Sequence, residues 1–247
     1  MYEYCTTPRT HTRNHIVFPC LSDVMHGAFP DALAPSRVTI VAYGALLSEA
    51  SSRVTFPSLS NFRLVRVRGM RRLFGMTHLF LTSEGIADMR TLRCAALSVE
   101  RADDCSFIGA AYEVELDDEQ RAAFCEREMG YDITTCSFSE MPAEAPSGTG
   151  VICAASSDHQ LGADFPWPPG VSTIWDWSPS SGLRPADVYL RHCLLAMAKI
   201  GGEAEHSFLH DTTLVDRKTS LHQYLTTERK VVMAATPPTA LATRFGG

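Results

Sequence analysis

The chain has 247 residues, 45% of them hydrophobic and 20% charged, so it can bury one sizeable core, with or without an appended subdomain. The formal net charge of -6 argues against nucleic acid or an anionic membrane surface as the main partner, because both attract basic proteins. Apolar runs stay well below the roughly 20 residues that cross a bilayer, and the first residues lack the apolar segment of a signal peptide. A small-molecule or protein partner fits this composition better, and the oligomeric state stays open.

Eight cysteines are scattered without a Cys-x-x-Cys pair, at positions 5, 20, 94, 105, 125, 136, 153 and 193. Their spacing matches neither a zinc ribbon nor a dithiol redox motif. We therefore expect reduced thiols and a cytoplasmic location.

Residues 1–36 mix Thr, Arg, His, Pro and Asn with little periodicity, which predicts a flexible extension outside the core. A transit peptide is the alternative. Glu3, Asp23 and Asp31 depart from the acid-poor composition of such peptides, so we favour the extension.

A series of strand-like runs then precedes any strong helix, at 38–41, 62–68, 73–80, 92–99 and 107–115. Gly69 predicts a hairpin or an abrupt bend between the second and third runs, and the polar residues 101–104 predict a turn between the last two. This order favours an α+β domain with a mostly antiparallel or mixed sheet, curled into a small barrel with flanking helices.

Helical patterns follow at 117–128, where Asp117 can cap the first turn, and at 185–199, which Gly201 and Gly202 end. A last helical stretch reaches residue 225. We expect one domain over 37–230, including a C-terminal helical appendage from about residue 171, and a flexible tail over 231–247.

The first candidate site is the loop Tyr43-Gly44-Ala45-Leu46-Leu47, which follows the apolar run at 38–41. Because Gly44 has no side chain, a ligand can approach the main-chain N–H groups of this loop, which suit a carboxylate or an oxyanion. A plain tight turn is the alternative interpretation.

The second candidate is the end of the helix at 117–128, where Glu126 and Glu128 flank Arg127 before Gly130 and Tyr131. Residues two apart on a helix point in different directions, so at most one of the two carboxylates can face a shared pocket. The alternative is a solvated helix end.

Together, the two stretches resemble the γ-glutamylcyclotransferase family, whose members carry a Tyr-Gly-Ser-type loop after the first strand and an Arg-Glu pair at a helix end. Arg127-Glu128 with Tyr131, and the segment 69–74, are similar to the ChaC-type branch, and the resemblance covers roughly residues 37–156. Ala45 departs from the usual serine or threonine, so a hydroxyl contact from that position is missing.

The resemblance implies that Glu128 is the catalytic acid/base and that no metal or organic cofactor takes part. The substrate would be a small γ-glutamyl peptide or amine, such as glutathione, from which 5-oxoproline is released. Tyr43, Gly44, Ala45, Leu46, Leu47 and Tyr131 would bind it, and Arg72 is our candidate partner for a substrate carboxylate because guanidinium binds carboxylate bidentately. A cyclotransferase-like binding module without activity is the alternative.

Three further features carry weaker hypotheses. His206 and His210 could share a helical face as metal ligands, but a third spaced ligand is missing, and Cys125 has no histidine nearby in sequence to activate it as a nucleophile. The proline-rich segment 165–179 carries Trp167 and Trp175, which either border the substrate entrance or attach the helix at 185–199 to the barrel.

Overall fold

The computed structural model describes residues 29–142, 148–163, 165–167 and 170–245. Most of the predicted N-terminal extension, with Cys5 and Cys20, lies outside this range. In the described residues, every helix is too short or too polar to cross a membrane.

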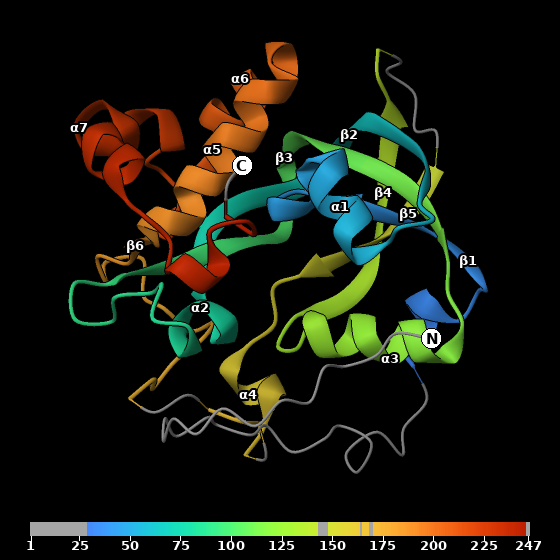
Figure 1. The fold of residues 1–247 in the computed structure, drawn as a ribbon, viewed down its shortest axis with the longest axis horizontal. Helices are drawn as coiled ribbons and strands as arrows, with labels where there is room; N and C mark the ends of the chain where they lie inside the picture. The colour runs from blue at the N-terminus through green and yellow to red at the C-terminus, as the bar shows by residue number, and fades with distance from the viewer. Residues whose placement is uncertain (1–28, 143–147, 164, 168–169, 246–247) are drawn as a thin grey trace.

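Five strands close into a mixed β-barrel (Figure 1). They are β1 (Arg37–Ala42), β2 (Ser60–Thr77), β3 (Arg93–Glu115), β4 (Asp132–Glu140) and β5 (Gly148–Ala154). Around the barrel they follow the order β3-β1-β5-β4-β2, and β2 pairs back with β3 to close it. Of the pairs between these described barrel strands, β1–β5 is parallel and the others are antiparallel. The barrel and its flanking helices confirm the predicted α+β class.

Two long strands replace four of the predicted short ones. The hairpin alternative at Gly69 is wrong: β2 runs through it, with a register shift between Arg68 and Met70 and a φ of +72° at the glycine. Glycine adopts this conformation without strain, so the strand bends and continues. The turn predicted at 101–104 is also wrong, because these residues belong to β3 and Arg101 pairs with Met70.

The helices flank this barrel. The remaining elements are η2 (Asp31–Leu33), η3 (Ala45–Leu47), α1 (Glu49–Thr55), α2 (Leu79–Ser83), α3 (Asp118–Arg127), α4 (Asp158–Leu161), β6 (Arg184–Pro185), α5 (Asp187–Ile200), α6 (Gly202–His210), β7 (Thr212–Leu214), α7 (Leu221–Ala234) and η4 (Thr239–Leu241). α3 and α5 confirm the helices predicted at 117–128 and 185–199. A capping box between Asp117 and Gln120 begins α3, as the acidic start of that segment indicates.

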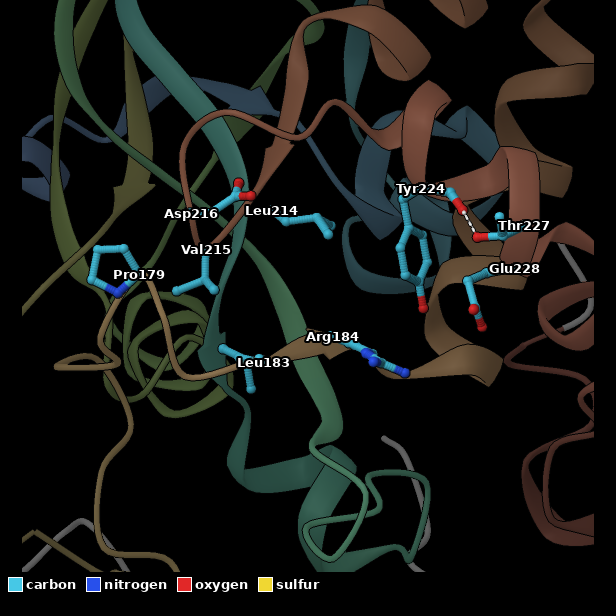
Figure 2. A pocket seen from close by; sticks show the side chains of 10 residues that line it. Pro179, Leu183, Arg184, Leu214, Val215, Asp216, Tyr224, Thr227 and Glu228 are labelled. Carbon is cyan, nitrogen blue, oxygen red and sulfur yellow. Dashed lines mark hydrogen bonds between the residues drawn. The ribbon is translucent and has the colours of Figure 1, made fainter.

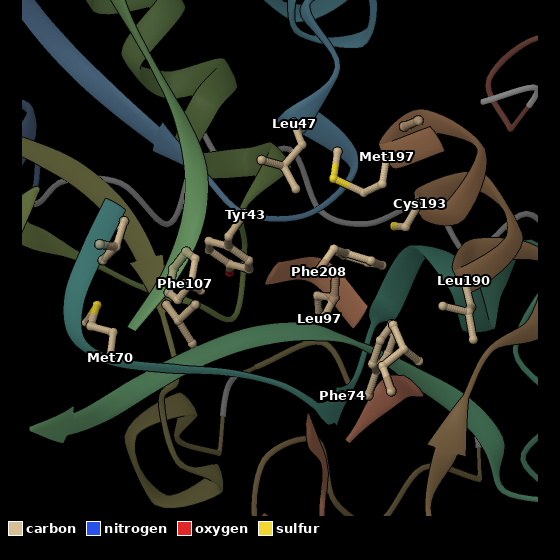
Figure 3. Packing of buried hydrophobic residues seen from close by; sticks show 14 of the residues in the cluster. Tyr43, Leu47, Met70, Phe74, Leu97, Phe107, Leu190, Cys193, Met197 and Phe208 are labelled. Atoms are coloured by element: carbon tan, nitrogen blue, oxygen red, sulfur yellow. The ribbon is translucent and has the colours of Figure 1, made fainter. Parts of the chain in front are cut away.

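The C-terminal helices share a core with the sheet. Leu190 and Cys193 of α5 and Phe208 of α6 pack with Phe74 of β2 and Leu97 of β3, and all five side chains are buried (Figure 3). The short strands β6 and β7 also pair in parallel with β3 and β2. The helical appendage is therefore built onto the same sheet as the barrel.

The end of the chain differs from the flexible tail predicted over 231–247. α7 continues to Ala234, and Phe245 is only 4% exposed, packed in an apolar cluster with Ile86 and Trp175. Burial of this aromatic side chain fixes the segment against the domain. Residues 246–247 lie outside the described range.

Candidate functional site

A cavity of about 1030 Å³ opens where the loop after β1 meets the C-terminal end of α3. Six of the residues predicted from the sequence line it: Tyr43, Gly44, Ala45, Leu46, Glu128 and Tyr131. The same cavity is also lined by residues of α2, of α5 and of the segment after α7. The fold thus joins the two sequence stretches that were singled out separately.

The glycine loop forms one wall of this cavity. Tyr43 follows the barrel strand and its hydroxyl donates to the carbonyl of Cys153 on β5 at 2.5 Å, which fixes the start of the loop. The N–H of Leu47 donates to the carbonyl of Gly44 at 2.9 Å. The N–H groups of Ala45 and Leu46 begin this 3-10 turn and have no acceptor within it. These two N–H groups are suited to receive an anionic oxygen.

Glu128 caps the C-terminus of α3. Its side chain is 14% exposed, and its Oε1 accepts from Nε of Arg127 at 2.8 Å. Arg127 in turn donates from Nη1 to Thr55 of α1 at 2.6 Å, so the carboxylate is oriented through a second element. The thiol of Cys153 also interacts with Glu128; burial and this carboxylate raise the pKa of the thiol, which keeps it protonated. Glu126 lines the cavity as well but is exposed.

Tyr131 follows Glu128 through a tight turn. The N–H of Tyr131 donates to the carbonyl of Glu128 at 3.1 Å, and Gly130 adopts a φ of +98° between them. The Tyr131 hydroxyl donates to the carbonyl of Leu97 at 2.9 Å. Burial, followed by the charge of Glu128, raises the pKa of Tyr131, so this hydroxyl stays neutral.

Two predicted substrate-binding residues lie elsewhere. Leu47 is 1% exposed in the core shown in Figure 3. Arg72 is fully buried between the rings of Phe107 and Phe208, with its Cζ 4.9 and 4.8 Å from their centroids. Its Nε donates to Thr212 Oγ1 at 2.8 Å. This guanidinium lies between the barrel and β7 and is not among the side chains that line the cavity, although its Nη1 donates to the carbonyl of Tyr43, at the start of the glycine loop, at 3.5 Å.

Sequence reasoning missed the contribution of the C-terminal half. Tyr189 and His192 of α5 line the cavity, as does Arg244 after α7. Tyr189 and His192 lie in a helix rich in apolar residues, but nothing in the sequence tied them to the glycine loop. His78, before α2, also lines the cavity; burial, then the charges of Arg127 and Arg244, lower its pKa to about 4, so it is neutral at pH 7.

A second cavity of about 270 Å³ lies between β6 and α7 (Figure 2). Its wall includes Arg184, Tyr224 and Glu228. The carboxylate of Glu228 is paired with Arg93, and none of the predicted catalytic or substrate-binding residues lines this cavity. We therefore take the larger cavity as the candidate active site.

The two weaker hypotheses concerned a histidine metal site and Cys125 as a nucleophile. His206, His210 and His222 form a stack of rings with centroids 4.3 and 4.5 Å apart, and no group of three potential ligands among the described residues is arranged to hold a metal ion. Burial raises the pKa of the Cys125 thiol, which favours its neutral and unreactive form.

No family model and no curated protein sequence matches the chain. Among solved structures, a γ-glutamyl cyclotransferase is similar at 13% sequence identity and a TM-score of 0.38. The match covers 49% of this chain and 67% of that protein's chain. A yeast γ-glutamyl cyclotransferase specific to glutathione is similar at 12% sequence identity and a TM-score of 0.46. The match covers 80% of this chain and 96% of the yeast chain. An uncharacterized human protein is similar at 11% sequence identity and a TM-score of 0.47. The match covers 83% of this chain and 91% of the human chain.

Proposed function

We propose that this protein is a γ-glutamyl cyclotransferase, which releases 5-oxoproline from a γ-glutamyl peptide or amine. The observation that supports the proposal best is the meeting of Glu128 with the Tyr43-Gly44 loop in one cavity. This cyclisation needs a carboxylate that transfers protons and main-chain N–H groups that bind the oxyanion.

Glu128 is the general base of the first step. The substrate enters with its α-amine as an ammonium group, and the Glu128 carboxylate removes one proton from it. The ion pair with Arg127 and the contact of Arg127 with Thr55 hold the carboxylate in one orientation, which favours this transfer.

The free amine then attacks the γ-carbonyl carbon of the same substrate. A C–N bond forms, a five-membered ring closes, and the carbonyl oxygen becomes an oxyanion. The N–H groups of Ala45 and Leu46 bind this oxygen, and because the fold already orients them, no reorganisation is needed as the charge develops.

Collapse of the tetrahedral intermediate breaks the bond from the γ-carbon to the leaving nitrogen. Glu128 delivers its proton to the leaving nitrogen, then takes the extra proton from the ring nitrogen and passes it to the released amine, which leaves as an ammonium group. The products are 5-oxoproline and the free amine or peptide, and Glu128 returns to its ionised form. All reacting groups other than this carboxylate belong to the substrate, so positioning supplies much of the rate enhancement.

The direct test is to incubate the purified protein with glutathione, γ-glutamyl amino acids and γ-glutamylamines and to measure 5-oxoproline. Product from at least one class is expected. Binding of these compounds without any product would favour the alternative, a binding module that keeps the cavity but has lost the activity.

A further inference from the structure

The chain returns to the candidate active site after α7. Phe245 is buried, and its ring lies edge-on to His192 with centroids 5.6 Å apart. The N–H of Phe245 donates to the carbonyl of Leu241, in η4, at 3.1 Å. These contacts hold the preceding residue, Arg244, at the cavity wall.

Arg244 stacks on an aromatic ring. Its guanidinium carbon lies 4.0 Å from the ring centroid of Phe80, a cation–π contact that uses the face of the guanidinium and leaves its N–H edge available. Among the described residues it forms neither a hydrogen bond nor an ion pair, and Glu84 and Glu128 influence it only through their charges. Its pKa is lowered, first by burial and then by the positive charge of Arg127, and the charges of Glu84 and Glu128 oppose this shift.

The arginines at 127 and 72 are already engaged. Arg127 donates to Glu128 and Thr55, and Arg72 donates to Thr212 within the core. Arg244 is therefore the cation of the cavity wall that has its N–H edge free for a ligand, within the part of the chain that the structure describes. The ligand chemistry that matches a free guanidinium edge is a carboxylate, which accepts two parallel N–H bonds.

We infer that Arg244 binds a carboxylate on the leaving part of the substrate, so that γ-glutamyl amino acids or peptides are accepted in preference to γ-glutamylamines. This inference rests on the proposed function. The reacting amine and γ-carbonyl must lie between Glu128 and the glycine loop. Arg244 stacks on Phe80 of α2 and belongs to neither of the elements that carry Glu128 and the glycine loop, which suits it to the portion of the substrate beyond the bond that breaks.

A matched pair of substrates tests this inference. γ-Glutamyl-alanine and γ-glutamyl-ethylamine differ only by the carboxylate of the leaving amine. We expect Arg244→Gln to lower the ratio of kcat/KM for γ-glutamyl-alanine to kcat/KM for γ-glutamyl-ethylamine on the order of 10- to 100-fold. This is the usual contribution of a hydrogen bond to a charged group. Arg244→Lys should retain part of the preference, because it keeps the charge but not the bidentate geometry. Arg90→Gln, at a side chain that is 93% exposed, is the control and should leave the ratio unchanged.

Equal losses for both substrates in Arg244→Gln would overturn the inference and indicate a general electrostatic or structural role, and an unchanged ratio would overturn it as well. If the wild-type protein makes no 5-oxoproline from these two compounds, from glutathione or from the other γ-glutamyl compounds of the panel, the proposed function fails. Calorimetric Kd values for the two compounds then decide the inference separately: selective weakening of γ-glutamyl-alanine binding by Arg244→Gln upholds it, and equal or undetectable binding overturns it.

Discussion

The hydroxyl of Tyr189 occupies the space next to Gly44: a Cβ placed on Gly44 would lie 2.9 Å from Tyr189 Oη. This contact joins the glycine loop after β1 to α5, a helix of the C-terminal appendage. A side chain at Gly44 would therefore displace a wall of the active-site cavity as well as block the approach to the loop.

We expect Gly44→Ala to lower kcat/KM, on the order of tenfold, because the added methyl group pushes Tyr189 out of place. Gly44→Val should abolish substrate binding, since its branched side chain fills the approach to the N–H groups. Removal of the hydroxyl in the double variant Gly44→Ala/Tyr189→Phe should restore part of the activity that Gly44→Ala loses. If the double variant loses as much activity as the two single losses combined, the clash between the added methyl group and the Tyr189 hydroxyl is not the cause of the loss in Gly44→Ala.

Glu128→Gln should reduce kcat at least on the order of 100-fold, the usual contribution of a general acid/base, while Kd for the substrate changes little. Glu126→Gln is the matched control, because this neighbouring carboxylate also lines the cavity but is exposed. We expect it to keep most of the activity in a 5-oxoproline assay. If Glu126→Gln were the inactive variant, the assignment of the base would be wrong.

Residues of both stretches that the sequence singled out line the larger cavity. Tyr43-Gly44 follows a strand, and Glu128 ends a helix whose capping residues can be read directly, so local rules located both. Arg72 was proposed because a guanidinium binds a carboxylate bidentately, but its partner Thr212 lies far along the chain and only the fold reveals that contact. Arg244 follows a segment rich in proline and threonine, and burial of Phe245 is a tertiary effect that such composition does not show.

Stability should fall in acid because of His192, which is 3% exposed. Burial, then the charges of Lys199 and Arg244, lower the pKa of its imidazole to about 4. Between about pH 6.5 and the folded value, the unfolded chain binds a proton that the folded chain does not. The free energy of unfolding should thus be independent of this group above pH 6.5 and fall below it, by at most about 1.4 kcal/mol per pH unit.

Urea unfolding of the wild type and His192→Gln from pH 7.5 to 4.5 checks this prediction. The variant should show a shallower decline, although some decline remains because the pKa of His78 is lowered in the same direction. Equal slopes for both proteins would show that His192 takes up its proton in the folded state.

Arg72→Met should destabilise the protein by roughly 1–3 kcal/mol, as expected when buried acceptors lose their donor. The variant loses the hydrogen bonds to Thr212 and to the carbonyls of Ile108 and Tyr43, at 2.8, 3.0 and 3.5 Å. KM of the folded variant should change little, because the guanidinium does not line the cavity. A raised KM at unchanged stability would instead support a direct contact between Arg72 and the substrate.

Trp175 packs against the turn that carries Glu128, outside the cavity lining. Its side chain is 9% exposed, its Nε1 donates to the carbonyl of Gly130 at 2.8 Å, and its ring lies edge-on to Tyr131 with centroids 5.3 Å apart. Trp167 contacts Phe165 and is only partly buried. These positions favour packing over a border role at the substrate entrance.

We expect Trp175→Ala to lower the free energy of unfolding by roughly 3–5 kcal/mol, the range for removing a large aromatic side chain from a core. Activity should fall by the same factor for γ-glutamyl-alanine and γ-glutamyl-ethylamine, because the turn that carries Glu128 loosens without any change in the substrate contacts. Trp175→Phe should keep much of the ring packing but lose the hydrogen bond to Gly130, and so lie between wild type and alanine in stability. An altered substrate ratio at near-wild-type stability would show instead that Trp175 borders the entrance and selects the substrate.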